Sequence, residues 1–79
     1  MSLFMRTNKE LEDGRVLCTT YERDGSVTLA ITFTDRLLGW MEVSREALVK
    51  DPKCLDYYRE RLAVRYPRGS TGTKRMRSL

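Results

Sequence analysis

The segment Ser26-Val27-Thr28-Leu29-Ala30-Ile31-Thr32-Phe33 decides the fold, because its side chains alternate between two kinds. Large apolar residues occupy every second position from Val27 to Phe33, and small or polar residues stand between them. Successive side chains of a β-strand point to opposite faces of a sheet, so this alternation predicts a strand with one apolar face. We therefore expect the segment to place Val27, Leu29, Ile31 and Phe33 in the core.

Turn signals on both sides of this strand predict a β-meander. Asp13-Gly14, Asp24-Gly25 and Thr34-Asp35 recur about every ten residues, and Asp-Gly is typical of tight hairpin loops because glycine accepts a positive φ. The neighbouring strands are predicted at residues 15–22 and 37–43. Residues 3–12 are predicted to add an edge strand, whose charged side chains would protect it from aggregation.

The register of the first predicted hairpin depends on the length of its loop. A two-residue loop at Asp24-Gly25 predicts the cross-strand pairs Val16 with Phe33, Cys18 with Ile31 and Thr20 with Leu29, and it places Cys18 in the core. A loop that differs by one residue would exchange the two faces and place Leu17, Thr19 and Tyr21 in the core. We favour the first register.

The second half of the chain has the pattern of helices. Ser44 is predicted to cap a short helix over residues 45–50, and Asp51-Pro52 starts a second helix that runs to about Tyr66 before Pro67. Apolar residues recur along the second helix with the spacing of a single face. This core-facing stripe consists of Leu55, Tyr58, Leu62 and Tyr66.

Together these elements predict an α+β fold, in which a three- or four-stranded antiparallel β-meander packs against a C-terminal helix. At 79 residues the chain is too short for a second core, so we expect one domain at residues 1–66 and a flexible, disordered basic tail at residues 67–79. A core of this size stabilises a fold only weakly, which makes a homodimer a reasonable expectation.

The positive charge is concentrated in the tail. Residues 1–66 contain eleven Lys and Arg and eleven Asp and Glu, so their charges cancel. The net charge of +4 therefore comes from four cations in a segment that has no acidic residue. These cations are Arg68, Lys74, Arg75 and Arg77.

The sequence argues against an enzyme. It contains no histidine, no phosphate-binding glycine loop and no paired cysteines at metal-ligand spacing, so we expect no catalytic residues, cofactor or metal. Asp56 and Glu60 share one helical face and are interpreted as a solvated surface. Cys54 lies beside Lys53 at the start of the second helix, where a thiolate would be favoured, but a buried, inert thiol is the preferred interpretation.

The sequence also argues against a membrane or secreted location. No apolar run approaches the length of about 20 residues that crosses a bilayer, and the first residues lack the pattern of a secretory signal. We therefore expect a cytoplasmic protein whose two cysteines stay reduced.

Tyr57, Arg61 and Arg65 lie four residues apart and form a third face of the second helix. An aromatic ring can stack on a base while neighbouring guanidinium groups hold phosphates, and the tail cations would extend this surface. The first hypothesis is therefore a non-enzymatic nucleic-acid-binding accessory protein that uses Tyr57, Arg61, Arg65, Arg68, Lys74, Arg75 and Arg77.

The alternative hypothesis is a small protein-binding adaptor or inhibitor. Trp40 and its neighbours Leu37, Leu38 and Met41 would form an apolar patch if they were exposed, and such residues are enriched at protein interfaces. This protein would act through that patch and an exposed sheet edge, on a protein partner or as a homodimer. Burial of Trp40 beneath the helix is the competing interpretation.

Overall fold

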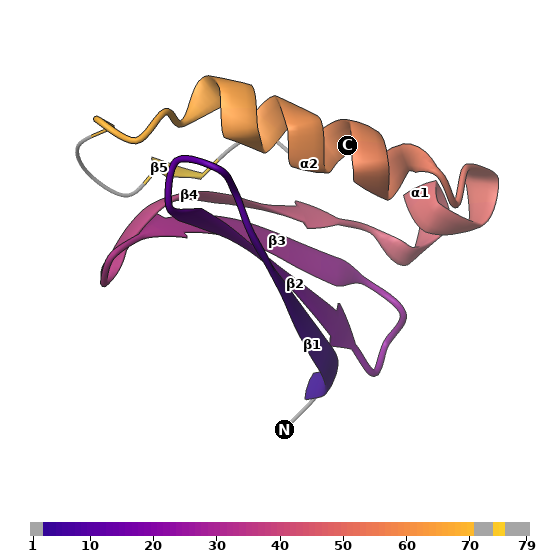
Figure 1. Ribbon diagram of the computed structural model, residues 1–79. Coiled ribbons are helices and arrows are strands. Elements are labelled where there is room, and N and C mark those ends of the chain that lie inside the picture. Colours follow the sequence, from indigo (N-terminus) through magenta and orange to yellow (C-terminus); the bar gives the residue numbers. More distant parts are fainter. Residues whose placement is uncertain (1–2, 71–73, 76–79) are drawn as a thin grey trace.

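The computed structural model describes the backbone of residues 3–70 and 74–75 and the side chains of residues 5–70. Five strands form one sheet in chain order, and the first four are antiparallel neighbours. Two helices lie on one side of this sheet (Figure 1). The elements are β1 (Leu3–Glu10), β2 (Arg15–Glu22), β3 (Val27–Phe33), β4 (Arg36–Val43), α1 (Arg45–Lys50), α2 (Cys54–Arg65) and β5 (Lys74–Arg75). The predicted α+β meander with a helix packed against it is confirmed.

The favoured register of the β2–β3 hairpin is wrong, and the alternative register is present. Leu17 lies opposite Ile31, Thr19 opposite Leu29 and Tyr21 opposite Val27. The loop has three residues, because the backbone N–H of Glu22 donates to the carbonyl of Ser26 across Arg23, Asp24 and Gly25. Gly25 takes the positive φ of 93° at the last loop position, which is typical of three-residue hairpins.

This register moves Cys18 out of the core. Cys18 lies opposite Ala30 and is half-buried on the sheet face away from the helices, so its predicted core position is wrong. The additional loop residue is the physical cause, since a shift of one residue exchanges the two faces of a strand.

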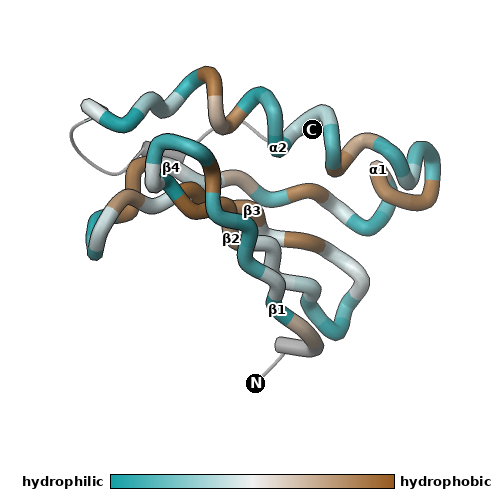
Figure 2. The backbone as a smooth tube through the Cα atoms, viewed as in Figure 1, coloured by the Kyte–Doolittle hydropathy of each residue, from teal (hydrophilic) through white to brown (hydrophobic). Residues whose placement is uncertain are grey.

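The core lies between α2 and the central strands. It contains the predicted face of β3 and the predicted stripe of α2, and Leu29, Ile31 and Leu62 are completely buried. Figure 2 shows the hydrophobic residues gathering in β3 and β4 and recurring along α2. In β4, Leu38 and Met41 are buried beneath the helix, whereas Trp40 lies opposite Ala30 on the other face and is half-buried.

Two arginines attach α2 to the strand β2. Arg15 Nη1 donates to the carbonyl oxygens of Ala63 at 2.6 Å and Tyr66 at 2.8 Å, at the helix end where carbonyls lack intrahelical partners. Its Nε donates to Asp13, and the contacts from Arg15, chiefly from its backbone N–H, lower the pKa of that carboxyl. Arg59 donates from α2 to Thr19, a buried polar residue of β2.

The helix boundaries follow local capping. The hydroxyl of Ser44 accepts a hydrogen bond from the backbone N–H of Ala47, which confirms the predicted cap of α1. The second helix begins two residues later than Pro52, at Cys54, because the carboxylate of Asp51 first accepts a bond from the backbone N–H of Lys53. It ends at Arg65, one residue before the predicted end.

The strand β5 lies within the segment that the sequence predicts to be a tail without secondary structure. Lys74 lies opposite Gly39 and Arg75 opposite Trp40, in a parallel pairing with β4. The main chain at these two residues therefore extends the sheet beyond β4.

Candidate nucleic-acid interface

The structure brings Tyr57 and Arg61 together on the outward side of α2. Tyr57 is 53% exposed, whereas Tyr58 and Tyr66 are buried. Arg61 Nη1 donates to the hydroxyl of Tyr57 at 3.0 Å, and its guanidinium carbon lies 5.6 Å from the ring centroid. Tyr57 also contacts the buried Tyr58 edge to face, with the two ring centroids 5.3 Å apart. These contacts place the cation of Arg61 beside an exposed aromatic ring.

Arg65 lies one turn beyond Arg61 and is exposed. The predicted face of Tyr57, Arg61 and Arg65 is thus formed by three accessible side chains from one rigid helix. Its cations can reach phosphates from the same side on which the ring is exposed.

The structure describes the side chain of only one of the four predicted tail cations, Arg68. Arg68 is exposed, and its guanidinium lies 5.5 Å from the ring centroid of Phe33 at the end of β3. Lys74 and Arg75 lie in β5, and their side chains are outside the described residues, as is all of Arg77.

Sequence reasoning missed Val64, which belongs to the same outward side of α2. Val64 is 82% exposed and follows Arg61 by three residues and Tyr57 by seven, so it lies along the same stripe. A second apolar periodicity on the helix, offset from the core stripe, is the signal that could have identified it. This residue gives the surface an apolar side next to its cations.

The acidic residues of α2 limit the cationic surface to one side of the helix. Asp56 and Glu60 are both exposed, as expected of a solvated face. Asp56 accepts a hydrogen bond from Arg59 at 3.0 Å, so part of its charge is compensated within the helix. Arg59 itself points toward β2 and does not add to the outward surface.

The two cysteines are free and half-buried. Burial, followed by the nearby charge of Asp51, raises the pKa of the Cys54 thiol above its ordinary value. This direction is opposite to the activation that a nucleophilic cysteine needs, and it supports the interpretation of Cys54 as an inert thiol.

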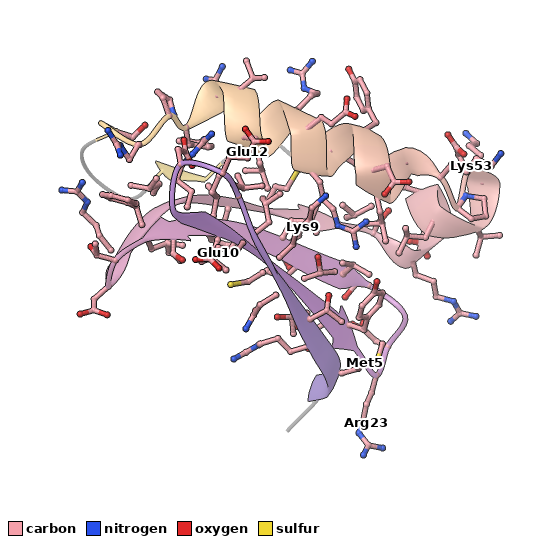
Figure 3. All side chains as sticks on the ribbon, viewed as in Figure 1. Met5, Lys9, Glu10, Glu12, Arg23 and Lys53 are labelled. Carbon is pink, nitrogen blue, oxygen red and sulfur yellow. The ribbon has the colours of Figure 1, made fainter. Side chains whose placement is uncertain are left out.

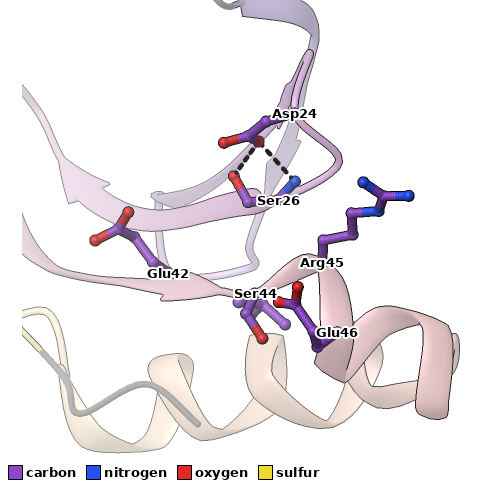
Figure 4. Close-up of a pocket in the computed structure, with 7 residues that line it drawn as sticks. Asp24, Ser26, Glu42, Ser44, Arg45 and Glu46 are labelled. Carbon is purple, nitrogen blue, oxygen red and sulfur yellow. Dashed lines mark hydrogen bonds between the residues drawn. The ribbon is translucent and has the colours of Figure 1, made fainter.

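Two shallow hollows lie near α1. The first, of about 460 Å³, is lined by Asp24, Ser26, Glu42, Arg45 and Glu46 among others (Figure 4). Asp24 accepts hydrogen bonds from the hydroxyl and the backbone N–H of Ser26, which hold the pKa of its carboxyl below the ordinary value. These bonds stabilise the hairpin loop and account for the position of that carboxylate without a ligand.

The second hollow, of about 430 Å³, lies at the junction of the two helices and has a mostly apolar lining that includes Ala47, Cys54 and Tyr58. Its lining also includes Ser44 and the charged residues Glu46, Lys50 and Asp51. Within the part of the chain that the structure describes, no three metal-ligating side chains gather into a group.

Neither α1 nor α2 has the length and apolar character needed to cross a membrane, and the described residues contain no other helix. Comparisons with protein-family models, with curated proteins and with solved structures found no match to this chain. The fold and its surfaces are therefore the basis for a proposal of function.

Proposed function

We propose that this protein is a small, non-enzymatic nucleic-acid-binding accessory protein. In this proposal Arg61 and Arg65 contact phosphates, and Tyr57 stacks on a base. Arg68, Lys74, Arg75 and Arg77 add electrostatic attraction. The observation that carries the proposal is the exposed ring of Tyr57, held by Arg61 on the same side of α2 as Arg65.

The preferred ligand is a single strand, because a base must be unstacked before it can lie on the Tyr57 ring. A duplex would use only the cations and would bind by counterion release alone. The surface has few residues, so we expect weak affinity and little dependence on base sequence.

The alternative of a protein-binding patch around Trp40 has less support. Leu38 and Met41 are buried beneath α2, whereas Leu37 and Trp40 lie on the opposite face and are half-buried. The four apolar residues therefore belong to two faces and do not form the single patch on which that hypothesis depends.

The test is fluorescence anisotropy with a labelled oligothymidine strand and a duplex of equal length, at several salt concentrations. Tyr57→Ala should weaken single-strand binding by ~1 to 3 kcal/mol through lost stacking and leave duplex binding nearly unchanged. Tyr57→Phe keeps the ring but loses the hydroxyl that accepts a hydrogen bond from Arg61, so it should retain most of the single-strand affinity that Tyr57→Ala loses. Loss of affinity that is equal for both ligands would contradict the stacking role.

The salt dependence of nucleic-acid binding tests whether the cations contact phosphates. Arg61→Ala and Arg65→Ala should each lower the slope of log affinity against log salt by ~0.7 on single strands, if each contacts one phosphate. Arg23→Ala is the matched control, since Arg23 extends away from the body at the hairpin tip (Figure 3). Replacing all four tail cations with glutamine keeps the main chain of β5 and should lower the slope by up to ~2.8. Absence of binding at low salt would reject the proposal.

A further inference from the structure

The strands β1 to β4 have a second face, here called the open face, which neither α1 nor α2 covers (Figure 1). The strand registers arrange its residues in rows that run across the sheet from β1 to β4. The first row is Arg6, Thr20, Thr28 and Glu42. The second row is Asn8, Cys18, Ala30 and Trp40. The third row is Glu10, Val16, Thr32 and Leu37.

The side chains at the centre of the open face are small and half-buried. Its central positions on β2 and β3 are small or β-branched, among them Cys18, Ala30 and Thr20, and the charged residues lie on the outer strands β1 and β4 and at the end of β2. Small central side chains with a polar rim allow a second sheet to pack against this face.

The charge of this face argues against a nucleic acid as its partner. On β1 to β4 it contains one arginine, Arg6, and three carboxylates, Glu10, Glu22 and Glu42. A surface with an excess of acids repels a polyanion. It repels a second copy of this chain less, because Arg6 of each copy can pair with a carboxylate of the other. The outward side of α2 and the open face therefore suit partners of different classes.

We propose that the open face is the interface of a homodimer, in which the sheets of two copies pack face to face. The first row has Arg6 at its β1 end and Glu42 at its β4 end. The twofold axis of this dimer runs between the two sheets, parallel to the strands and level with the gap between β2 and β3. It places β1 of one copy opposite β4 of the other, so the two ends of every row face each other. It therefore brings Arg6 of each copy to Glu42 of the other, and Cys18 to Ala30, as an isologous interface requires.

The size of the face sets the strength of this dimer. Four strands spaced ~4.8 Å apart and about six residues at ~3.4 Å give a patch of roughly 400 Å² on each copy. This is about half of the ~800 Å² per partner that stable complexes bury, so the dimer belongs to the weak, transient class. We expect dissociation at micromolar concentrations and association toward millimolar.

Cysteine labelling tests the location of the interface. The full chain is alkylated at concentrations from about 10 µM to about 1 mM, a range that spans a weak dissociation constant, and each thiol is followed by mass spectrometry. Cys18 should become several-fold slower to react as the dimer forms. Cys54, on the helix side, is the internal control and should react at one rate throughout. Equal behaviour of both thiols would overturn the proposal.

Charge-reversal substitutions at Arg6 and Glu42 test the proposed geometry of the dimer. Arg6→Glu and Glu42→Arg should each weaken self-association at least about tenfold in sedimentation equilibrium, because each gives like charges at both paired positions. A mixture of the two variants should recover the parent affinity as a heterodimer, since both opposite-charge pairs are restored. Arg23→Glu, the same charge change outside the face, should associate like the parent.

Circular dichroism of each variant verifies the fold, and Ala30→Arg provides a second disruption at the centre of the face. A parent protein that stays monomeric at about 1 mM would refute the homodimer, given the affinity expected for this patch. A dimer that survives Ala30→Arg, or variants that do not recover on mixing, would place the interface elsewhere, for example at the β1 edge.

Discussion

Replacing Gly39 with alanine should destabilise the fold strongly, because the ring of Tyr66 occupies the space that a side chain needs. A Cβ built on Gly39 would lie 2.5 Å from both Cδ2 and Cζ of Tyr66. Ordinary carbon contacts are about 3.5 to 4.0 Å, so the ring would have to move by at least ~1 Å. Tyr66 is 5% exposed and its carbonyl accepts a hydrogen bond from Arg15, so such a shift would disrupt the end of α2.

Overpacking of a filled core costs ~1 to 3 kcal/mol, and complete loss of ring packing costs ~3 to 5 kcal/mol. We therefore expect Gly39→Ala to cost ~3 kcal/mol, or roughly 12 to 24 °C in melting temperature for a domain of this size. Urea titrations followed by circular dichroism measure the cost. Gly69→Ala is the matched control, because no atom lies within 4 Å of its Cβ position, and it should melt like the parent.

A double-mutant cycle with Tyr66→Leu identifies the cause. If the ring is the obstacle, Gly39→Ala should cost less in the Tyr66→Leu background by ~1 kcal/mol or more. If Gly39→Ala lowers the unfolding free energy equally in the parent and in the Tyr66→Leu variant, the steric argument is refuted. The effect would then arise from the backbone of β4 and not from the Tyr66 ring.

Three further predictions concern the core, the helix end and a thiol. Leu62→Ala should cost ~2 to 5 kcal/mol in urea titrations, whereas Val64→Ala, two residues away but exposed, should lie within ~0.5 kcal/mol of the parent. Arg15→Met should lower the unfolding free energy by ~1.5 to 3 kcal/mol, because it leaves two carbonyl oxygens at the end of α2 without their charged donor. Its effect should be smaller if water replaces that donor, which a structure of the variant would reveal. Because the folded pKa of Cys54 is raised, less thiolate is present at any pH below it, so alkylation at pH 8 should be slower than for an unfolded control peptide, with its midpoint at higher pH. Faster alkylation than in the peptide would contradict the direction of that shift.

The elements of this fold could be predicted from the sequence because each depends on local signals. The alternation from Val27 to Phe33 and the Ser44 cap both specify their structures within a few residues. The β2–β3 register could not be fixed in this way, because Asp24-Gly25 fits both a two-residue loop and the last positions of a three-residue loop. The choice depends on which face of β2 packs under α2, and that is a tertiary contact.

The candidate site was predicted from helical periodicity, which correctly groups Tyr57 with Arg61. Sequence spacing could not show that Arg59 turns inward to Thr19, or that Arg68 lies over Phe33, since both contacts join residues distant in the chain. The sheet faces of the four apolar residues between Leu37 and Met41 could not be assigned from the sequence for a different reason. A register shift between Ile31 and Thr32 in the β3–β4 pairing breaks the alternation, so Leu38 is buried beneath the helix while Leu37 is only half-buried.

The two proposed surfaces lie on opposite sides of the sheet, and this separation predicts that they act independently. Packing the open faces together leaves the α2 helices on the two outer sides of the dimer. Two helix layers and two sheets at ~10 Å spacing put the helix axes roughly 30 Å apart, and the outward Tyr57 rings therefore roughly 40 Å apart. A strand of about four nucleotides is too short to reach both rings, so calorimetric titration should give one strand per chain at concentrations below and above the dimer transition. Arg6→Glu should leave this stoichiometry and the salt slope unchanged, whereas Tyr57→Ala should leave self-association unchanged. Coupling in either direction would mean that the two partners compete for one surface, and it would refute the assignment of nucleic acid to α2 and of a second copy to the open face.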